Sequence, residues 1–234
     1  MVYLTSDLHG KLASLQKLLE KARFFDDVQN ELYILGDVID RNESGGVDAL
    51  RLIARTPNMV LLLGNHEKMM LDCAWYFEYD GQSPLHSTML KDLARWKRNG
   101  AGVTIDAMKQ LSREDREGLL RYVEGCPLYK TVFVHDRKYV LVHGGLGNFA
   151  PGKDLDDYTP DELLWERPNF DTTYEPKSYT VVFGHTPTQF YGPQYKGRMI
   201  RTDSWWNIDT GGATTDGHPM LICLDTGEEF YIDG

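Results

Sequence analysis

Hydrophobic and polar positions along the first third of the chain predict three strand-and-helix units. Three apolar runs have the length of buried strands, and each precedes a stretch with apolar residues three and four positions apart. The predicted strands lie at 2–7, 31–37 and 58–65, and the predicted helices at 11–24, 47–56 and 66–77. Because strands that are joined through helices make right-handed crossovers, we expect these strands to form a parallel sheet.

The pattern changes twice further along the chain. Residues of about 70–126 are predicted to form a helical insertion, with amphipathic stretches at 90–97 and 112–123 and a capping pair, Ser112 and Asp115. From residue 129 hydrophobic residues recur at every second position, which predicts mainly strands, interrupted by one short helix. These strands are expected at 129–145 (two runs), 178–186 and 219–232, and the helix at 159–168. We predict one α/β (α+β) domain over residues 1–234.

Composition and charge narrow the class of protein. The 234 residues are 41% hydrophobic and 26% charged, which is ordinary for a globular protein. We find no bilayer-length apolar run and no signal peptide, so we expect a cytoplasmic protein. Three cysteines, an odd number, indicate reduced thiols. The net charge of −10 disfavours nucleic acid and membranes as partners, so an anionic substrate needs local positive charge.

Five predicted strands end on side chains that can bind a metal ion. Carboxyl ends of strands in α/β sheets meet at one edge, where ligands commonly bind. One such residue alone is more typical of a turn, but five coincidences are improbable. The six side chains proposed as ligands are Asp7, His9, Asp37, Asn65, His143 and His185.

The donor types indicate the metal and how it is shared. Oxygen and imidazole donors without sulfur suit Mn²⁺, Fe or Zn²⁺ and argue against a thiolate site. Asp7 and His9, two positions apart in extended chain, are expected to point to the same side. A carboxylate such as Asp37 can bridge two ions. We therefore expect two divalent metal ions, Mn²⁺ before the alternatives.

Several blocks of the sequence resemble a known family. In order, they resemble the signature blocks of the phosphoprotein phosphatase family of calcineurin-like metallophosphoesterases, and the chain length is similar to that of the bacterial and phage lambda-type members. The blocks are SDLHG (6–10), GDVIDR (36–41), GNHE (64–67), VHGG (142–145) and FGHT (183–186), followed by NIDTGG (207–212). The resemblance implies a β-sandwich of two mixed sheets flanked by helices, with a binuclear metal centre at its mouth.

The resemblance also implies residue roles. The first metal is assigned to Asp7, His9 and Asp37, and the second to Asp37, Asn65, His143 and His185. The catalytic set is His66 as general acid, Asp40 as its carboxylate partner and Arg41 as a phosphate clamp. Arg167 is our candidate for a second substrate-binding arginine. The chain departs from the family pattern at Asn42, where glycine is usual, and we expect asparagine to tolerate the left-handed backbone there.

Family membership would make the chain a hydrolase, a metal-dependent serine/threonine protein phosphatase. A metal-bridging hydroxide would attack phosphorus directly, without a phosphoenzyme, and His66 would protonate the leaving oxygen. Its substrate would be a phosphorylated protein or a small phosphoester.

Other functions remain open from the sequence. Symmetrical diadenosine tetraphosphate hydrolases of the same family share the metal centre. A phosphodiesterase or nuclease is disfavoured by the acidic charge. Asp-Thr-Gly at 209–211 and 225–227 matches the aspartic protease motif without its context. A binding module that has lost activity is disfavoured because the candidate ligands and acid are all present.

Overall fold

The first sheet contains the three strands predicted in the N-terminal third. The computed structural model describes residues 1–42, 44–175 and 178–232. In it β1 (Val2–Thr5) pairs in parallel with β2 (Glu31–Ile34), which pairs in parallel with β3 (Met59–Leu61). The hairpin of β9 (Leu221–Cys223) and β10 (Glu229–Phe230) adds antiparallel strands on the other side of β1. The order is β10-β9-β1-β2-β3, which confirms the predicted parallel pairing.

The second sheet is built from the C-terminal half of the chain. Its strands, in the order β4-β5-β6-β8-β7, are β4 (Tyr129–Val134), β5 (Arg137–Val142), β6 (Tyr179–Phe183), β8 (Trp205–Asn207) and β7 (Ile200–Arg201). The β5–β6 and β6–β8 pairs are parallel, and the two outer pairs are antiparallel. Both five-stranded sheets are therefore mixed, as the resemblance implied. The sequence did not predict β7 and β8, because two and three residues are too few to show alternation.

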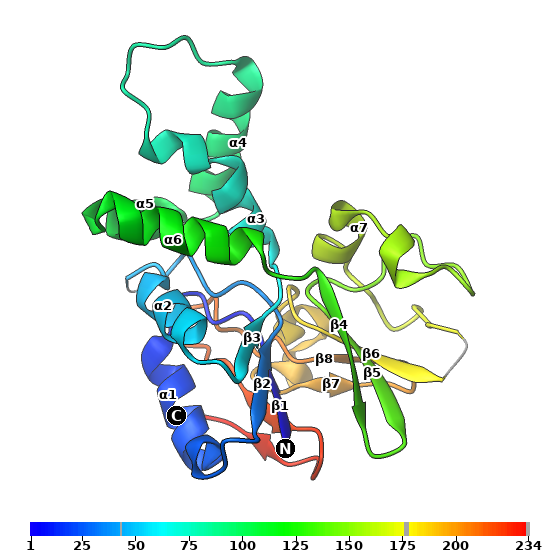
Figure 1. The fold of residues 1–234 in the computed structure, drawn as a ribbon. Coiled ribbons are helices and arrows are strands. Elements are labelled where there is room, and N and C mark those ends of the chain that lie inside the picture. The colour runs from blue at the N-terminus through cyan, green and yellow to red at the C-terminus, as the bar shows by residue number, and fades with distance from the viewer. Residues whose placement is uncertain (43, 176–177, 233–234) are drawn as a thin grey trace.

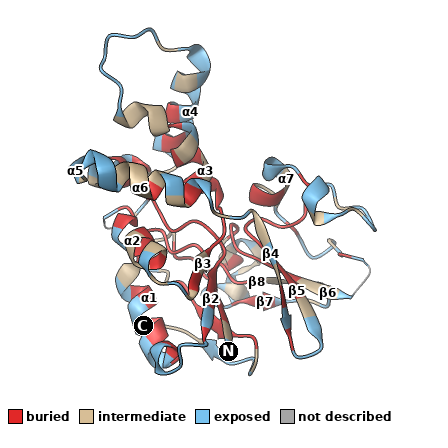
Figure 2. Ribbon diagram, in the orientation of Figure 1, coloured by how far each residue is buried: buried red, intermediate tan, exposed pale blue. Residues whose placement is uncertain are grey.

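Side chains that alternate along each strand divide the core into parts. One part lies between the two sheets, and another lies between the first sheet and its helices. Leu4 and Tyr33 face a cluster shared with the second sheet, which includes Leu141 and Val182. Tyr3, one position along, faces the helices instead, as the two-residue period of a strand requires. Figure 2 shows the buried residues concentrated along the strands and in the loops at their upper ends.

Seven α-helices lie among the described residues and flank the sheets (Figure 1). On the first sheet, α1 (Leu12–Lys21) and α2 (Val47–Arg55) bury one apolar face each, including Leu15, Leu18 and Ile53. On the second sheet lies α7 (Pro160–Leu164), where the Thr159 hydroxyl accepts a hydrogen bond from the Glu162 backbone N–H at 3.3 Å. Short 3₁₀ helices lie at Phe24–Asp26, Ala74–Phe77, Leu155–Asp157, Thr188–Tyr191 and Pro193–Tyr195.

The segment between the two sheets is helical, as predicted. It contains α3 (Asn65–Asp72), α4 (Ser87–Arg98), α5 (Gly102–Gln110) and α6 (Arg113–Glu124). These helices stand above the carboxyl ends of β1 to β3 (Figure 1), and the loop before α4 is exposed at the far end. The predicted cap of α6 is confirmed, because the Ser112 hydroxyl accepts a hydrogen bond from the Asp115 backbone N–H at 3.1 Å. The insertion therefore overhangs the edge where the candidate ligands were expected.

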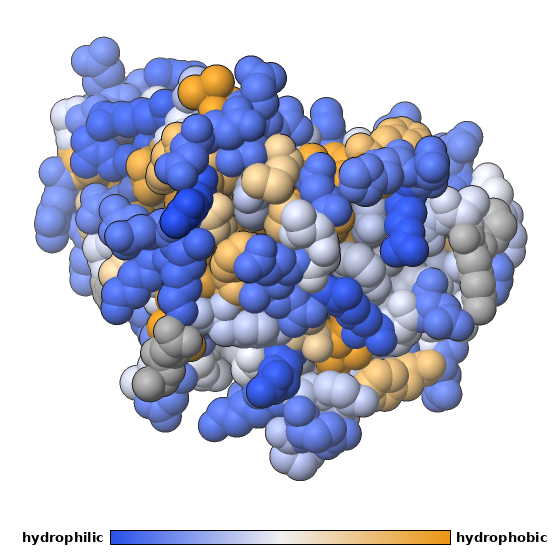
Figure 3. All heavy atoms as spheres, turned by 90° about the horizontal axis from the view of Figure 1, so that it is seen from below, coloured by the Kyte–Doolittle hydropathy of each residue, from blue (hydrophilic) through white to orange (hydrophobic). Residues whose placement is uncertain are grey.

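The face opposite the insertion is mostly hydrophilic, with apolar residues in small patches (Figure 3). Among the described residues, none of the helices has the length and apolarity needed to cross a bilayer.

Candidate active site

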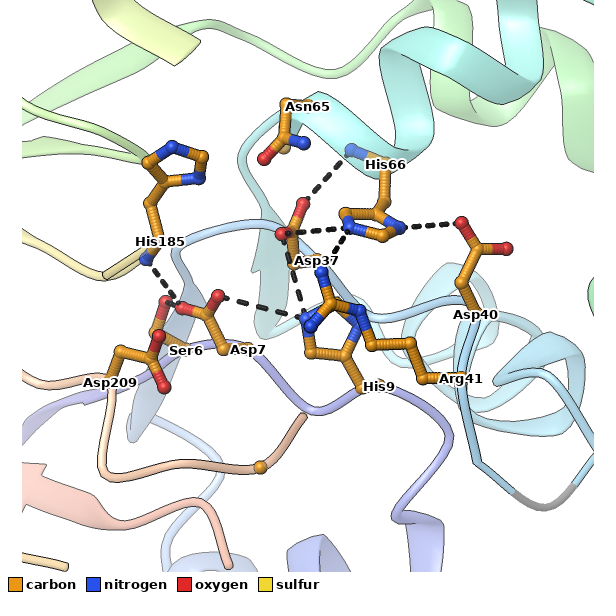
Figure 4. A network of polar contacts seen from close by, with 12 residues as sticks. Ser6, Asp7, His9, Asp37, Asp40, Arg41, Asn65, His66, His185 and Asp209 are labelled. Atoms are coloured by element: carbon orange, nitrogen blue, oxygen red, sulfur yellow. Dashed lines mark hydrogen bonds and ion pairs between the residues drawn. The ribbon is translucent and has the colours of Figure 1, made fainter. Parts of the chain in front are cut away.

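The six predicted ligands come together at the edge where the strands of both sheets end. Asp7 and His9 follow β1, Asp37 follows β2, and Asn65 begins α3 after β3. His143 and His185 follow β5 and β6 in the other sheet. All six are buried, with at most 7% of any residue exposed. Figure 4 shows five of them, Asp7, His9, Asp37, Asn65 and His185, around a common centre.

The first group of donors is built around the Asp37 carboxylate. The Nε2 atoms of His9 and His66 lie 3.7 and 3.8 Å from Asp37 Oδ2, and all three side chains are buried. Asp7 Oδ1 lies 3.9 Å from His9 Nε2. Ligating atoms of His9, Asp37 and His66 all lie within 4.8 Å of one another, so an ion held by His9 and Asp37 would have His66 directly beside it.

The second group shares Asp37. His143 Nε2 lies 3.4 Å from Asp37 Oδ1, 2.8 Å from Asn65 Oδ1 and 3.2 Å from His185 Nδ1. The other ring nitrogen of His185 is buried and has no hydrogen-bond partner among the described residues. A buried polar atom left in this way costs free energy unless a ligand satisfies it. Two buried His/Asp triads that share one carboxylate fit a binuclear metal site, and they leave the metal unidentified.

Left-handed backbone turns, not extended chain, bring the ligands of β1 together. We expected Asp7 and His9 to alternate in extended conformation, and that was wrong. Their φ angles are 52° and 41°, and Asp37 and His185 also lie in the left-handed region, at 56° and 65°. Non-glycine residues pay a cost for this conformation, which persists only where the surroundings hold them. Here the backbone N–H of His9 donates to the Asp37 carbonyl at 2.9 Å.

A buried glutamate supports the Asp37 loop. The Glu67 carboxylate accepts hydrogen bonds from the backbone N–H groups of Asp37 (2.8 Å), Val38 (2.9 Å) and Gly64 (3.1 Å). Burial, with the nearby Asp37 charge, raises the pKa of Glu67 to about 7. Glu67 belongs to the GNHE block, but its role could not be predicted from the sequence, because its partners are backbone groups that no motif displays.

Burial sets the charge of the histidine ligands. It lowers the pKa of His9 to about 3 and that of His185 to about 2, with neighbouring histidines adding to the effect. Both are therefore neutral at pH 7, which is the form that binds metals. Burial also disfavours a charged His143, but the Asp37 carboxylate outweighs it and raises the pKa of His143 to about 10.

Metal uptake is expected to release protons. Because the pKa of His143 is raised to about 10, an ion that binds there must displace about one proton at pH 7, and affinity must fall as pH is lowered. Titration calorimetry with Mn²⁺ in two buffers of different ionisation enthalpy measures the release. His143→Ala should reduce it, and the exposed His135→Ala should not. Identical heats in both buffers would contradict the expectation.

The predicted catalytic side chains lie beside the triads. His66 Nδ1 is 2.6 Å from Asp40 Oδ2, and both side chains are buried. Burial lowers the pKa of His66, but Asp37 and then Asp40 outweigh it, so the pKa is raised above its usual value of 6.5. Arg41 Nη2 lies 3.2 Å from His66 Nε2. Figure 4 shows Asp40, His66 and Arg41 in a row on the α3 side of the centre.

Arg167 also belongs to the pocket. Its Nη1 donates to the hydroxyl of Thr186, the residue after the candidate ligand His185, at 2.9 Å. The guanidinium groups of Arg41 and Arg167 therefore contribute to one cavity. The residues that line it are Asp7, His9, Asp37, Arg41, Asn65, His66, Asn99, Trp165, Arg167, His185, Pro187, Asp209 and Ala213. The two arginines thus supply local positive charge in an otherwise acidic protein, and an anion can be held beside them.

The structure adds site residues that the sequence analysis missed. Asp209 lines the pocket and is fully buried, and its Oδ2 has no hydrogen-bond partner in the part of the chain that the structure describes. Burial, with the Asp7 charge, raises its pKa well above the usual value. It follows β8, so it is a further strand-end acid that was hidden because β8 was not predicted. The second Asp-Thr-Gly begins at Asp225, which accepts a hydrogen bond from the Val2 backbone N–H at 2.7 Å and lies in a different cavity. The two copies therefore do not form a protease dyad.

Two mixed sheets with buried His/Asp triads and arginines at one edge define a metal-dependent phosphoesterase. The sequence profile of the calcineurin-like phosphoesterase family matches residues 1–209. The chain belongs to this family.

Individual relatives carry two kinds of name. The chain is 27% identical over 192 residues to serine/threonine-protein phosphatase 2 of Salmonella typhimurium, covering 79% of this chain and 78% of that one. It is 42% identical over 74 residues to a symmetrical bis(5'-nucleosyl)-tetraphosphatase of Actinobacillus succinogenes, covering 31% of this chain and only 26% of the relative. A crystal structure of a candidate diadenosine tetraphosphatase superposes with a TM-score of 0.64 at 18% identity, covering 99% of this chain and 92% of that one. At 18% identity, this superposition supports a shared fold and says nothing about the substrate.

Proposed function

We propose that the protein is a phosphoprotein phosphatase that hydrolyses phosphoserine and phosphothreonine esters. The observation that carries the proposal is the buried His66, which lines a cavity together with two arginines and has Nδ1 2.6 Å from Asp40 Oδ2. An alkoxide is a poor leaving group, so this substrate needs a proton donor of that kind. The likeness to the Salmonella phosphatase, which extends over most of both chains, supports the same substrate class.

In the proposed reaction Arg41 and Arg167 bind the phosphoryl oxygens. His66 Nε2 gives its proton to the leaving oxygen, while Asp40 holds Nδ1 and so fixes the ring. In the structure Arg41 Nη2 lies close to Nε2. Arg41 must therefore turn toward the phosphoryl group before Nε2 can carry a proton for transfer.

The metal ligands proposed are Asp7, His9 and Asp37 for one ion, and Asp37, Asn65, His143 and His185 for the other. When bound, two divalent ions lower the pKa of water toward about 7 and offset phosphoryl charge. We propose Mn²⁺ as the native ion, since oxygen and imidazole donors suit it. Metal analysis of protein purified without added metal, by plasma mass spectrometry, tests this choice, and stoichiometric Zn²⁺ or iron would reverse it.

Side-by-side phosphate release tests the substrate class. The Mn²⁺-loaded protein is given a phosphoserine peptide, a phosphotyrosine peptide and diadenosine tetraphosphate at equal concentration. We expect the phosphoserine peptide to be dephosphorylated fastest, with loss of that activity in His66→Asn. Cleavage of the dinucleotide to nucleoside diphosphates, with both peptides untouched, would reject the proposal in favour of the hydrolase.

The dinucleotide hydrolase is the second candidate. It is supported by the 42% identity to the Actinobacillus enzyme, which exceeds the identity to the Salmonella phosphatase. The shared segment spans only 31% of this chain, whereas the match to the Salmonella phosphatase spans 79%.

Arg167→Ala is expected to raise KM for the phosphopeptide. A charge-assisted hydrogen bond at an exposed side chain is worth about 1.5 kcal/mol, which corresponds to about a tenfold rise. The exposed Arg55→Ala on α2 is a matched control and should leave KM unchanged. Steady-state kinetics with the phosphoserine peptide measures both variants, and an unchanged KM in Arg167→Ala would remove this residue from the substrate site.

A further inference from the structure

The Asp40 carboxylate has more partners than its histidine. Oδ2 accepts hydrogen bonds from His66 Nδ1 at 2.6 Å and from Trp96 Nε1 at 2.9 Å. Oδ1 accepts a hydrogen bond from the Thr104 hydroxyl at 2.5 Å. Asp40, Trp96 and Thr104 are each fully buried. Trp96 lies on α4 and Thr104 on α5, so the helical insertion supplies both additional donors.

The backbone that carries Asp40 is held by the same helices. Asp40 and Arg41 have φ angles of 72° and 73°, so they adopt the left-handed conformation. We had expected this conformation at Asn42, and that was wrong. Two successive non-glycine residues in this conformation are costly and need support. The Asp40 N–H donates to the Thr104 hydroxyl at 3.0 Å, and the Arg41 N–H donates to the Gly100 carbonyl at 3.1 Å.

Two glycines allow the insertion to approach this turn. A Cβ at Gly100, between α4 and α5, would lie 2.8 Å from Arg41 Cγ. A Cβ at Gly45 would lie 2.4 Å from the Thr104 backbone nitrogen. Any larger residue would separate the two segments. The contact is therefore close on both sides of Asp40.

We propose that Trp96 and Thr104 are positioning residues that fix the Asp40 carboxylate and, through it, the orientation of His66. A carboxylate bound only by one imidazole can rotate about its side chain and take the ring with it. Donors on both oxygens, from two different helices, prevent that rotation. The insertion then contributes to proton transfer without touching the substrate. This inference rests on the proposed role of His66 as proton donor.

Leaving-group dependence separates this role from a merely structural one. The variants are Trp96→Phe, which keeps an aromatic ring in edge contact with Phe77 but removes the N–H, and Thr104→Val, which keeps the shape but removes the hydroxyl. A misplaced general acid costs most where the leaving group needs a proton. We expect kcat for phenyl phosphate to fall by about 10- to 100-fold and kcat for p-nitrophenyl phosphate by less than about threefold, at unchanged KM.

Three controls accompany the measurement. Thr104→Ser keeps a hydroxyl and should recover the wild-type ratio between the substrates. Trp205→Phe removes another buried indole hydrogen bond, to the Thr172 carbonyl at 3.0 Å, and should keep the wild-type ratio even where it lowers the melting temperature. Adding Trp96→Phe to His66→Asn should cause no further loss, because the effect passes through His66.

Equal losses on both esters, or a further loss in the His66→Asn background, would overturn the positioning role. A different result would reject the proposed function, namely the absence of phosphate release from the phosphoserine peptide. The ratio between the two aryl esters does not depend on which natural substrate the protein prefers, so the two failures are distinguishable.

Discussion

Asp37→Asn is expected to remove most of the activity and at least one of the two metal ions. Asp37 is the one carboxylate shared by both buried triads, with oxygens 3.4 Å from His143 Nε2 and 3.7 Å from His9 Nε2. The amide keeps the size of the side chain but loses the negative charge and one donor oxygen. A loss of at least about 10³-fold in kcat/KM corresponds to about 4 kcal/mol of transition-state stabilisation.

Metal content is the decisive measurement for this variant. Plasma mass spectrometry of the Mn²⁺-loaded, desalted protein should give two ions per wild-type chain and at most one per variant chain. Asp26→Asn, at an exposed position, is the matched control and should keep both ions and full activity. Two ions with wild-type activity in Asp37→Asn would show that Asp37 does not bridge the metals.

His66→Asn is expected to reduce turnover of phosphoserine peptide by about 10²- to 10⁴-fold, the range that general acid catalysis supplies. The same variant should lose little activity on p-nitrophenyl phosphate, whose leaving group departs without a proton. The buried ring contacts Asp40 at 2.6 Å and Arg41 at 3.2 Å, so it stands between its orienting carboxylate and the proposed phosphate clamp.

The pH profile gives an independent check on His66. Its pKa is raised above 6.5, because Asp37 and Asp40 outweigh the effect of burial. The acid is the protonated form, which is present below that pKa and is lost as pH rises through it. Phosphoserine turnover should therefore decline at a pH above 6.5, and the p-nitrophenyl ester should lack this decline. The exposed His86→Asn is the matched control, and a profile in His66→Asn that matches the wild type would refute the assignment.

The strand-end residues could be predicted because both signals they need are local. An apolar run reports a buried strand, and the polar residue that ends it reports the edge of the sheet. Asp7, Asp37, His143 and His185 all follow runs of this kind. Topology then brings them together, since the carboxyl ends of parallel strands lie at one edge. The resemblance supplied the roles of His66 and Arg167, which spacing alone does not express.

Weak or nonlocal signals explain what was missed. Asp209 was not assigned to the pocket, because β8, which precedes it, has only three residues and was not predicted. The support of Asp40 depends on hydrogen bonds to Trp96 and Thr104, which are 56 and 64 positions away in the chain. No periodicity connects such positions, because contact between them arises only when α4 and α5 pack over the Asp40 turn.

The sequence by itself therefore determined the longer strands of both sheets, the helical insertion and most of the donors at the strand ends, since these follow from short-range patterns of polarity. Only the tertiary structure decided which left-handed turns aim those donors at one another, that Asp209 belongs to the pocket, and that the insertion fixes Asp40. Backbone strain of this kind survives only when residues distant in the chain hold it in place, as Thr104 holds Asp40.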